Sequence, residues 1–155
     1  MISVILPTFN EKKNIALISK KLSKIKPINE VIFVDDRSTD GTFKEIKKLR
    51  LKKFKGFLRK SKKRDLSKSV VFGAKKAKNN HILVMDCDLQ HDVKYISQMW
   101  KKFNSFKCDI VIANRFKNIK YSGNLGILRS FLSHLAIGTI NFIFEKKTPD
   151  PLSGF

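Results

Sequence analysis

Acidic residues, cysteines and long apolar runs are all scarce in this chain of 155 residues. It holds 13 Asp and Glu against 33 Lys and Arg, so its formal net charge at pH 7 is +20. The two cysteines, Cys87 and Cys108, lack the spacing of a metal site and suit a reduced cytosolic chain. The most apolar stretch, 131–144, is interrupted by His134 and Asn141 and is shorter than the roughly 18 residues that a membrane span needs. No basic segment precedes an apolar one near residue 1, so we expect no signal peptide.

Apolar runs and helical patterns alternate along most of the chain. Hydrophobic residues make up 42% of the composition, which is typical of a globular domain, and the length suits one domain. Strands are expected at the apolar runs 2–6, 30–35, 54–59, 81–86 and 109–115. Helices are expected at about 11–25, 42–51, 65–78, 92–104 and 126–144. Because the strands are continuous apolar runs separated by single helices, the pattern predicts an α/β fold with a mostly parallel sheet covered on both faces.

Short polar side chains stand where two of these helices are expected to begin. Asn10 is the candidate N-cap of the first helix, and either Asp65 or Ser67 is the candidate N-cap of the third. The third helix is expected to turn four apolar side chains toward the core, and these are Val70, Val71, Ala74 and Ala77.

Acidic residues stand directly after two of the expected strands. Asp35 and Asp36 follow one strand, while Asp86 and Asp88 follow another in the stretch VMDCDLQHD. In a parallel sheet the ligand site lies beyond the carboxyl ends of the strands, so we expect these acids at one edge. Two carboxylates at positions i and i+2 suit a divalent cation such as Mg²⁺ or Mn²⁺, and Gln90 adds a neutral oxygen.

Basic residues are concentrated in residues 44–64, which hold twelve Lys and Arg and a single acid, Glu45. Three interpretations compete for this cluster. Solvated helix faces in a Lys-rich chain rank first, and a surface for anionic lipid or an anionic substrate ranks second. Nucleic-acid binding ranks last, because Lys outnumbers Arg by 27 to 6 and Lys is the poorer residue for bidentate contacts to bases and phosphates.

Five short motifs occur in one order along the chain. They are ILPTFNEKKNI at 5–15, VDDRSTDGT at 34–42, MDCDLQHD at 85–92, ANRF at 113–116 and DPLSGF at 150–155. Together they resemble the GT-A glycosyltransferases of family 2, and the closest branch is the polyprenol-phosphate (dolichol-phosphate) mannosyl- and glucosyltransferases. The resemblance implies a GT-A, Rossmann-like fold over the whole chain and a nucleotide-sugar donor in its first half.

The resemblance also implies which residues contact the donor. The first loop matches positions at the nucleotide, the end of the second strand matches positions beside the base and ribose, and the D-x-D stretch matches positions at the ribose, diphosphate and metal. A basic residue in ANRF matches a position near the donor phosphates. The implied donor-binding residues are Pro7, Phe9, Glu11, Val34, Asp36, Asp86, Cys87, Asp88 and Arg115.

Three further roles are carried over in the same way. The implied metal ligands are Asp86, Asp88 and Gln90, and the implied partners of the acceptor phosphate are Arg129 and Ser133. The implied catalytic residues are Asp88, Arg115 and Arg129.

The resemblance implies an inverting transfer of mannose or glucose from GDP-mannose or UDP-glucose to a polyprenyl phosphate, with Mg²⁺ or Mn²⁺ as cofactor. Such an enzyme is expected to be cytoplasmic and peripheral at the inner face of the membrane, with no nucleic-acid partner. Two alternatives stay open. One is a glycosyltransferase of the same fold with another glycan or lipid acceptor, and the other is an inactive remnant that only binds nucleotide.

The resemblance ends inside a motif. The family continues beyond the SGF at 153–155, with a basic residue and a further helix, whereas this chain stops at Phe155. We therefore expect a single GT-A domain at 1–155 whose C-terminal part is missing, with weak or absent turnover by these residues alone.

Overall fold

The computed structural model describes residues 1–106, 108–113, 135–140 and 142. Two compact units follow one another along the chain, one spanning Met1–Trp100 and the other spanning Lys101–Gly154, and each is described by itself. The first unit holds every strand that the structure describes, and the second includes a helical stretch at 135–140. That stretch lies within the helix expected at 126–144, most of which falls outside the described residues.

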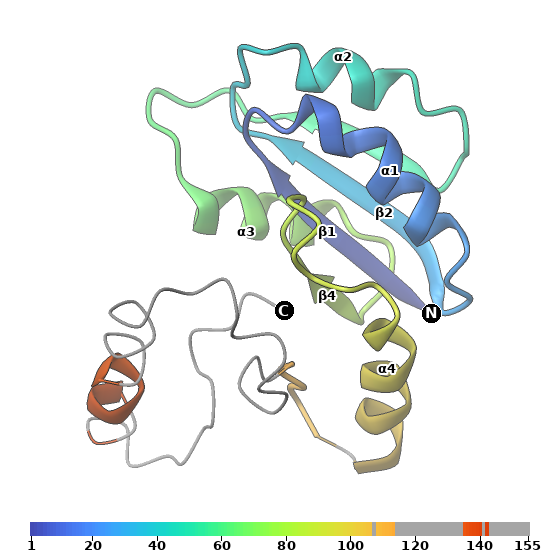
Figure 1. Cartoon of the computed structure of the whole chain (residues 1–155), viewed down its shortest axis with the longest axis vertical. Helices are drawn as coiled ribbons and strands as arrows, with labels where there is room; N and C mark the ends of the chain where they lie inside the picture. The colour runs from blue at the N-terminus through green and yellow to red at the C-terminus, as the bar shows by residue number, and fades with distance from the viewer. Residues whose placement is uncertain (107, 114–134, 141, 143–155) are drawn as a thin grey trace. The chain divides into compact units, whose positions relative to one another are not determined.

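Strands and helices alternate in the order that the sequence pattern predicts (Figure 1). The strands are β1 (Ile2–Thr8), β2 (Ile28–Asp35), β3 (Phe54–Leu58) and β4 (Ile82–Val84). The helices are α1 (Lys12–Ser23), α2 (Thr42–Lys47), α3 (Leu66–Lys76) and α4 (Tyr95–Phe106), the last of which continues past the end of the first unit. The four described strands pair in parallel in the order β3-β2-β1-β4, which confirms the predicted α/β fold with a parallel sheet.

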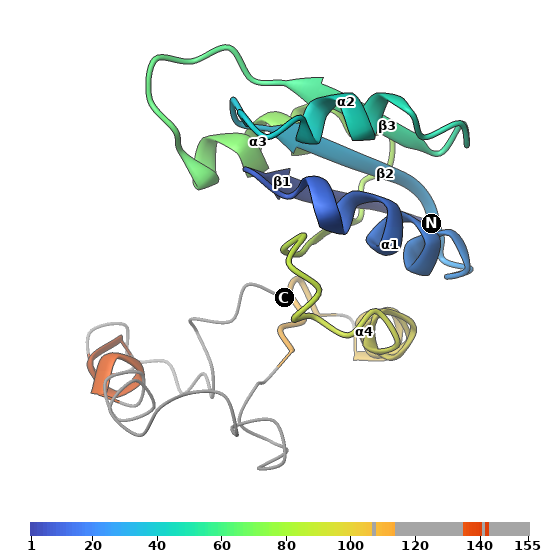
Figure 2. The same cartoon turned by 45° about the horizontal axis from the view of Figure 1, so that its top comes forward.

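Helices cover both faces of this sheet (Figure 2). α1 and α2 pack on each other and on one face, while α3 packs on β1 and β2 from the other. Because side chains alternate along a strand, Ile5, Ile32 and Val34 share the α3 face. They are fully buried there and pack with partly buried residues that include Phe57 and Phe72, whose rings meet edge to face.

The glycine in α3 sets how closely this helix approaches the sheet. A Cβ atom on Gly73 would lie 2.6 Å from Cγ2 of Ile5 and 3.0 Å from Cγ2 of Val34. Ser69, one turn earlier, is fully buried, whereas Val71 is 54% exposed. The expectation that Val71 faces the core is therefore wrong, because α3 packs on the sheet through Phe72 and Gly73, and Val71 lies on the outward side of the helix.

Two local expectations about the first and third helices have opposite outcomes. Asp65 is the N-cap of α3, where its side chain accepts a hydrogen bond from the backbone N–H of Lys68 at 2.9 Å. Asn10 is not the N-cap of α1, which is Glu11 without a side-chain cap. The reason is that Asn10 has a left-handed backbone, with φ of 56°, and its side-chain oxygen accepts the backbone N–H of Thr39 instead.

The fifth strand, expected at 109–115, does not form in residues 109–113, which the structure describes as irregular chain. Ile110 is 73% exposed and Ile112 is 44% exposed. An apolar run becomes a strand only where a neighbouring strand accepts its backbone hydrogen bonds, and sequence periodicity alone does not report that pairing.

A buried acid ties the strands together at the amino edge of the sheet. Glu30, in β2, accepts hydrogen bonds from the Ser3 hydroxyl and from the backbone N–H of Lys78, and it forms an ion pair with Lys55 of β3. Burial alone would raise the pKa of Glu30, but these donors outweigh burial and hold the pKa below its ordinary value. The ionised carboxylate therefore stabilises the packing of β1, β2 and β3.

Glu30→Gln should lower the free energy of unfolding by about 1–3 kcal/mol at pH 7, because a buried, charge-assisted network loses its anion. A folded pKa below the unfolded one contributes stability above the unfolded value and loses it as the pH falls through the folded value. The difference in unfolding free energy between the wild type and the variant should thus shrink below about pH 4.5. Urea unfolding at several pH values measures it. Glu45→Gln, which removes an exposed pair with Lys48, is the control and should change little at any pH.

Gly73→Ala should lower the unfolding free energy by about 1–3 kcal/mol, because the new methyl group has no space between α3 and the sheet. Gly138→Ala is a matched control, since this helical glycine has nothing within 4 Å of the position of its Cβ. Alanine should there leave stability unchanged or slightly raised. Thermal unfolding compares the two variants, and equal midpoints would contradict the close approach of α3.

Candidate functional site

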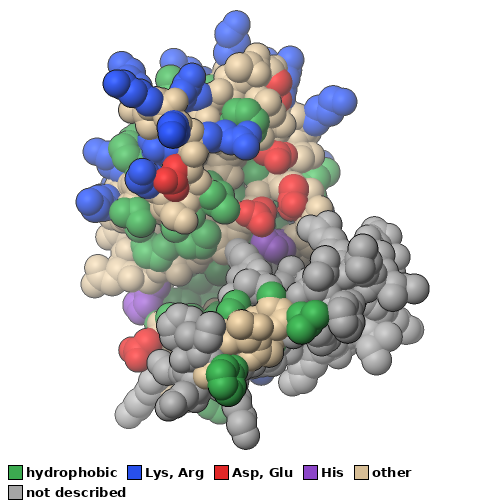
Figure 3. Space-filling model, turned by 90° about the vertical axis from the view of Figure 1, so that its left-hand side faces the viewer, with side chains coloured by type: hydrophobic (Ala, Val, Ile, Leu, Met, Phe, Trp, Pro, Cys, Tyr) green, Lys and Arg blue, Asp and Glu red, His purple; other side chains and the backbone are tan. Residues whose placement is uncertain are grey.

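Three connections meet at the carboxyl edge of the sheet, one after β1, one after β2 and one after β4. They meet because β1 pairs in parallel with both neighbours, in the registers Thr8 to Asp35 and Ile5 to Val84. Figure 3 looks onto this edge, where several Asp and Glu side chains lie near the middle and Lys and Arg side chains crowd the upper part. The edge that the sequence predicts as the site therefore carries side chains of both charges, with the basic ones mainly above the acidic ones.

Hydrogen bonds join the connection after β1 to the connection after β2. The backbone N–H of Glu11 donates to the Thr42 hydroxyl at 2.8 Å, and the side chain of Asn10 accepts the backbone N–H of Thr39 at 2.9 Å. Two more backbone donors complete the link, with Asn10 donating to Ser38 Oγ and Lys12 donating to Asp40 Oδ2. The two connections form one fixed wall of the site.

Unusual backbone conformations cluster at the same place. Among the described residues other than glycine, those with positive φ are Asn10 at 56°, Arg37 at 67° and Leu89 at 66°. Each follows a different strand, β1, β2 or β4, and each lies in a connection at the carboxyl edge. A left-handed backbone is energetically unfavourable for residues other than glycine. Such residues are concentrated in loops that hold functional groups in a fixed position.

Asp36, predicted to border the base and ribose, lies at this edge and is already engaged. Nη2 of Arg59 donates to both of its carboxylate oxygens, at 2.7 and 2.6 Å, and the backbone N–H of Asp65 adds a third bond at 2.7 Å. Burial alone would raise the pKa of Asp36, but the bonds from Arg59 and Asp65 hold the pKa below its ordinary value. Asp36 is thus a fixed anion that also positions the start of α3.

Arg59 is a site residue that sequence reasoning missed. It is buried, with 7% of its surface exposed, and Nε also donates to the Ser69 hydroxyl at 3.1 Å. Its place directly after β3, at the same edge as Asp36, is the signal that could have found it. Burying a guanidinium is unfavourable unless its charge is paired. A base at a buried strand end is therefore expected to pair with a carboxylate at the end of the neighbouring strand.

Two buried polar atoms near Asp36 have no hydrogen-bond partner among the described residues. Asp35 is fully buried, and its Oδ1 accepts the backbone N–H of Ser38 at 3.0 Å. Its Oδ2 and the Oγ1 of Thr8, its register partner on β1, have no hydrogen-bond partner in the part of the chain that the structure describes. Two buried oxygen atoms at the bottom of the site are therefore without a hydrogen bond from any described residue.

The D-x-D residues follow β4, and the pKa values of Asp86 and Cys87 are raised there. Burial raises the pKa of Asp86, the positive field of His91 opposes this, and the negative charge of Asp88 adds to it. Burial also raises the pKa of the Cys87 thiol to about 12, with further contributions from the charges of Glu11, Asp88 and Asp86. Cys87 is thus a buried neutral thiol, and Glu11 reaches the same cluster from the connection after β1.

The donor chemistry of this cluster fits a magnesium-type ion. Asp86 and Asp88 offer carboxylate oxygens, and the mutual repulsion that contributes to the raised pKa of Asp86 is the kind a cation would relieve. Within the described ranges, no group of three or more His, Cys, Asp or Glu side chains is arranged around a common metal position. A cation that keeps water and substrate phosphates as its other ligands needs only one or two protein carboxylates.

An aromatic ring marks the mouth of the site. Phe9, predicted at the nucleotide, is 36% exposed, and the guanidinium carbon of Arg64 lies 3.9 Å from the centre of its ring. Arg64 comes from the connection after β3, which therefore reaches across to the connection after β1. The stacking adds a cation–π contact at the rim of the site.

The remaining predicted site residues differ in burial, and three of them lie outside the described residues. Pro7 and Val34 are register partners and both are buried, so they form the floor below the edge. Gln90 is exposed, and its backbone N–H donates to Asp88 Oδ1 at 3.0 Å. The structure therefore brings together the predicted residues from Pro7 to Gln90, whereas Arg115, Arg129 and Ser133 lie outside the described residues.

Among the helices of the described residues, none is both long enough and apolar enough to cross a membrane.

Comparison with known proteins agrees with this architecture. The family model described as glycosyl transferase family 2 matches residues 3–153. A dolichol-phosphate mannosyltransferase of Pyrococcus furiosus is 33% identical over 158 residues, which is 99% of this chain and 45% of that protein. A dolichol-phosphate mannosyltransferase of Saccharomyces cerevisiae is 26% identical over 163 residues, covering 99% of this chain and 58% of that protein.

Solved structures agree on the fold. The crystal structure of S. aureus TarS 1–349 superposes with a TM-score of 0.57 at 24% identity, over 76% of this chain and 40% of that one. At this identity the likeness concerns the fold alone. The chain spans about half the length of the curated relatives it matches. The match over residues 3–153 and the mannosyltransferase relatives together establish that the chain belongs to glycosyl transferase family 2.

Proposed function

We propose that this chain forms the donor-binding part of an inverting glycosyltransferase that moves mannose or glucose from a nucleotide sugar to a polyprenyl phosphate. The observation that carries the proposal is the convergence of Asp86 and Asp88 with Glu11 and Asp36 at one edge of a parallel sheet. Asp86 and Asp88 can bind an anionic donor through a shared cation, with Glu11 and Asp36 at the same edge. Two relatives are named dolichol-phosphate mannosyltransferase, and these names support a mannose-type sugar and a polyprenyl phosphate acceptor.

We assign the donor to the fixed wall and the acids of this edge. Phe9 and Glu11 would border the nucleotide, with Pro7 and Val34 below it and Asp36 beside the base and ribose. Asp86 and Asp88 would hold Mg²⁺ or Mn²⁺, with Gln90 beside them, and buried Cys87 would pack behind the diphosphate. When bound, the cation stabilises the charge that develops on the departing nucleoside diphosphate.

The acceptor chemistry accounts for the kinds of residue assigned to it. A polyprenyl phosphate is already an anion at neutral pH, so it needs to be oriented more than it needs a general base. Arg115 would act near the donor phosphates, and Arg129 and Ser133 would hold the phosphate of the acceptor. A lipid acceptor also requires contact with a membrane, which we propose is made by a peripheral protein at the cytoplasmic face.

Asp88→Asn should weaken cation-dependent binding of the nucleotide by at least about tenfold, because one of two carboxylate ligands becomes neutral. The Asn oxygen can still accept the backbone N–H of Gln90, so the turn should survive. Calorimetric titration with GDP-mannose, UDP-glucose, GDP and UDP, in Mn²⁺ and in EDTA, measures the effect and identifies the donor nucleotide.

Asp92→Asn is the matched control for this variant. Asp92 lies in the same loop, but its carboxylate pairs with Lys94 and accepts the backbone N–H of that residue, a role that Asn can keep. Nucleotide binding by the control should equal that of the wild type. Binding that is equally strong in EDTA, or equally weak in both variants, would contradict a cation site at Asp88.

A further inference from the structure

Five bases surround the connection that follows β3. These residues, here called the basic rim, are Arg37, Lys60, Lys62, Lys63 and Arg64, and all five are exposed. Four of them come from the segment between β3 and α3, and Arg37 comes from the connection after β2. Parallel pairing of β2 with β3 brings these two connections to the same edge. The basic rim therefore lies at the edge that carries the candidate donor site, in keeping with the crowded Lys and Arg side chains of Figure 3.

Within the described ranges, no acid forms an ion pair with a residue of the basic rim. Of the twelve bases at 44–64, only Lys48, Lys55 and Arg59 form ion pairs with described residues. Arg37 uses Nη1 to donate to the carbonyl oxygens of Ser61 and Lys62, at 3.0 and 2.7 Å, which fixes the loop without neutralising it. Five exposed like charges on two adjacent connections repel one another, so the arrangement suits a surface that meets anions.

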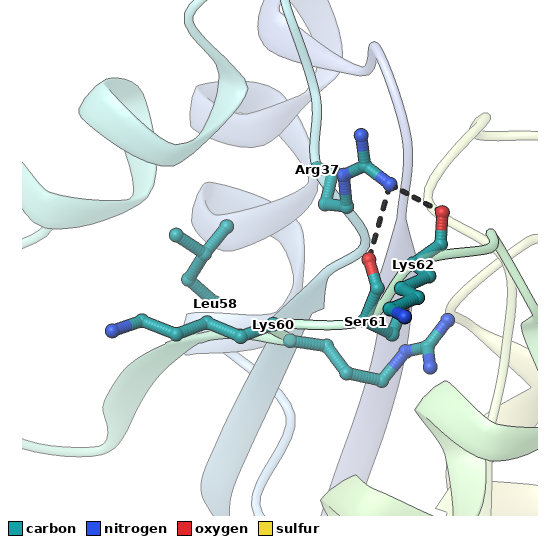
Figure 4. Close-up of a pocket in the computed structure, with 6 residues that line it drawn as sticks. Arg37, Leu58, Lys60, Ser61 and Lys62 are labelled. Atoms are coloured by element: carbon teal, nitrogen blue, oxygen red, sulfur yellow. Dashed lines mark hydrogen bonds between the residues drawn. The ribbon is translucent and has the colours of Figure 1, made fainter.

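Three residues of the basic rim, Arg37, Lys60 and Lys62, line an open hollow of about 400 Å³ (Figure 4). It is lined by Arg37, Leu58, Arg59, Lys60, Ser61 and Lys62. Arg37 closes one side of the hollow through its bonds to Ser61 and Lys62, and the side chain of Lys60 extends away from them. A hollow with several cations and one leucine has the chemistry to take a phosphate group at the end of an apolar molecule.

Protruding apolar side chains flank the same loop. Leu58, before it, is 41% exposed, and Leu66, after it, is 63% exposed. Bases interspersed with exposed leucines are the composition of a surface that lies in the headgroup region of a bilayer, with lysines at the phosphates and leucines at the acyl boundary. Sequence readout of nucleic acid would favour arginine forks over lysines, and three of the five rim residues are lysines.

We propose that the basic rim, with Leu58 and Leu66, docks onto an anionic lipid bilayer and so holds the donor edge against the membrane surface. The inference rests on the proposed function, because a polyprenyl phosphate acceptor is presented from a membrane. Charge complementarity selects the partner: five exposed bases without a carboxylate partner among the described residues match a sheet of lipid phosphates.

Vesicle sedimentation of the full chain tests the docking surface, with phosphatidylcholine vesicles that contain or lack phosphatidylglycerol. The rim variant is Lys60→Glu with Lys62→Glu. The control is Lys20→Glu with Lys26→Glu, which makes the same change of net charge at exposed positions near the carboxyl end of α1. Wild type and control should bind anionic vesicles at low salt, and the rim variant should bind at least about tenfold more weakly. Leu66→Gln, which changes no charge, should also weaken binding.

Several outcomes would overturn the inference. Equal loss in the rim variant and in the control would mean that net charge alone attracts the chain to lipid. Absence of binding by the wild type at low salt, where exposed charges are least screened, would exclude the surface altogether. Loss of duplex DNA binding in the rim variant, with vesicle binding unchanged, would assign the basic rim to nucleic acid.

Titration of the same variants with nucleotide separates this inference from the proposed function. If vesicles are not bound but GDP or UDP still binds with Mn²⁺, the docking surface is wrong and the donor site stands. If vesicles are bound through the basic rim but no nucleotide binds, the donor site is wrong and the docking surface stands.

Discussion

Parallel pairing of β1 with both β2 and β4 is the constraint on which the candidate site depends. It brings the ends of three strands to one edge, so residues near positions 9, 36 and 86 become neighbours although 27, 50 and 77 residues separate them pairwise in sequence. The close approach of α3, permitted by Gly73, holds β1 and β2 from behind. The ion pair between Asp36 and Arg59 then joins the end of β2 to the end of β3. Each site residue is thus held by an element that also belongs to the core.

The acids of the sheet divide into two physical classes. Glu30 and Asp36 each have a cationic partner and several donors, and the pKa of each is lowered. Asp86 is partly desolvated beside the negative charge of Asp88, and its pKa is raised. The carboxylates of Glu30 and Asp36 are neutralised by cationic side chains of the protein and stabilise the fold. Asp86 and Asp88 instead need a cation from outside the protein. That difference, more than the D-x-D spacing, distinguishes a candidate cation site from structural carboxylates.

The sequence predicts much of this fold because its signals are local. Continuous apolar runs locate β1 to β4, and Asp65 is recognisable as a cap because capping needs only the next few residues. The misses have a different origin. Asn10 was expected to cap α1 and instead bonds to Thr39, 29 residues away, and the run at 109–113 is apolar but forms no strand in the described structure. Arg59 was hidden among twelve bases, and only the fold distinguishes it as the partner of Asp36.

The two charged areas of the carboxyl edge are best understood together. Asp86 and Asp88 repel an anionic nucleotide when no cation is bound, since their charges lie in a partly desolvated site. The basic rim at the same edge provides an opposing field, and at physiological salt such a field acts over about 8 Å. It can raise the local concentration of anionic molecules without contributing ligands to the cation. Because β3 and β4 are the outer strands of the described sheet, the bases that follow β3 can attract phosphates from solution or from a lipid surface without competing as cations at Asp86 and Asp88, which follow β4.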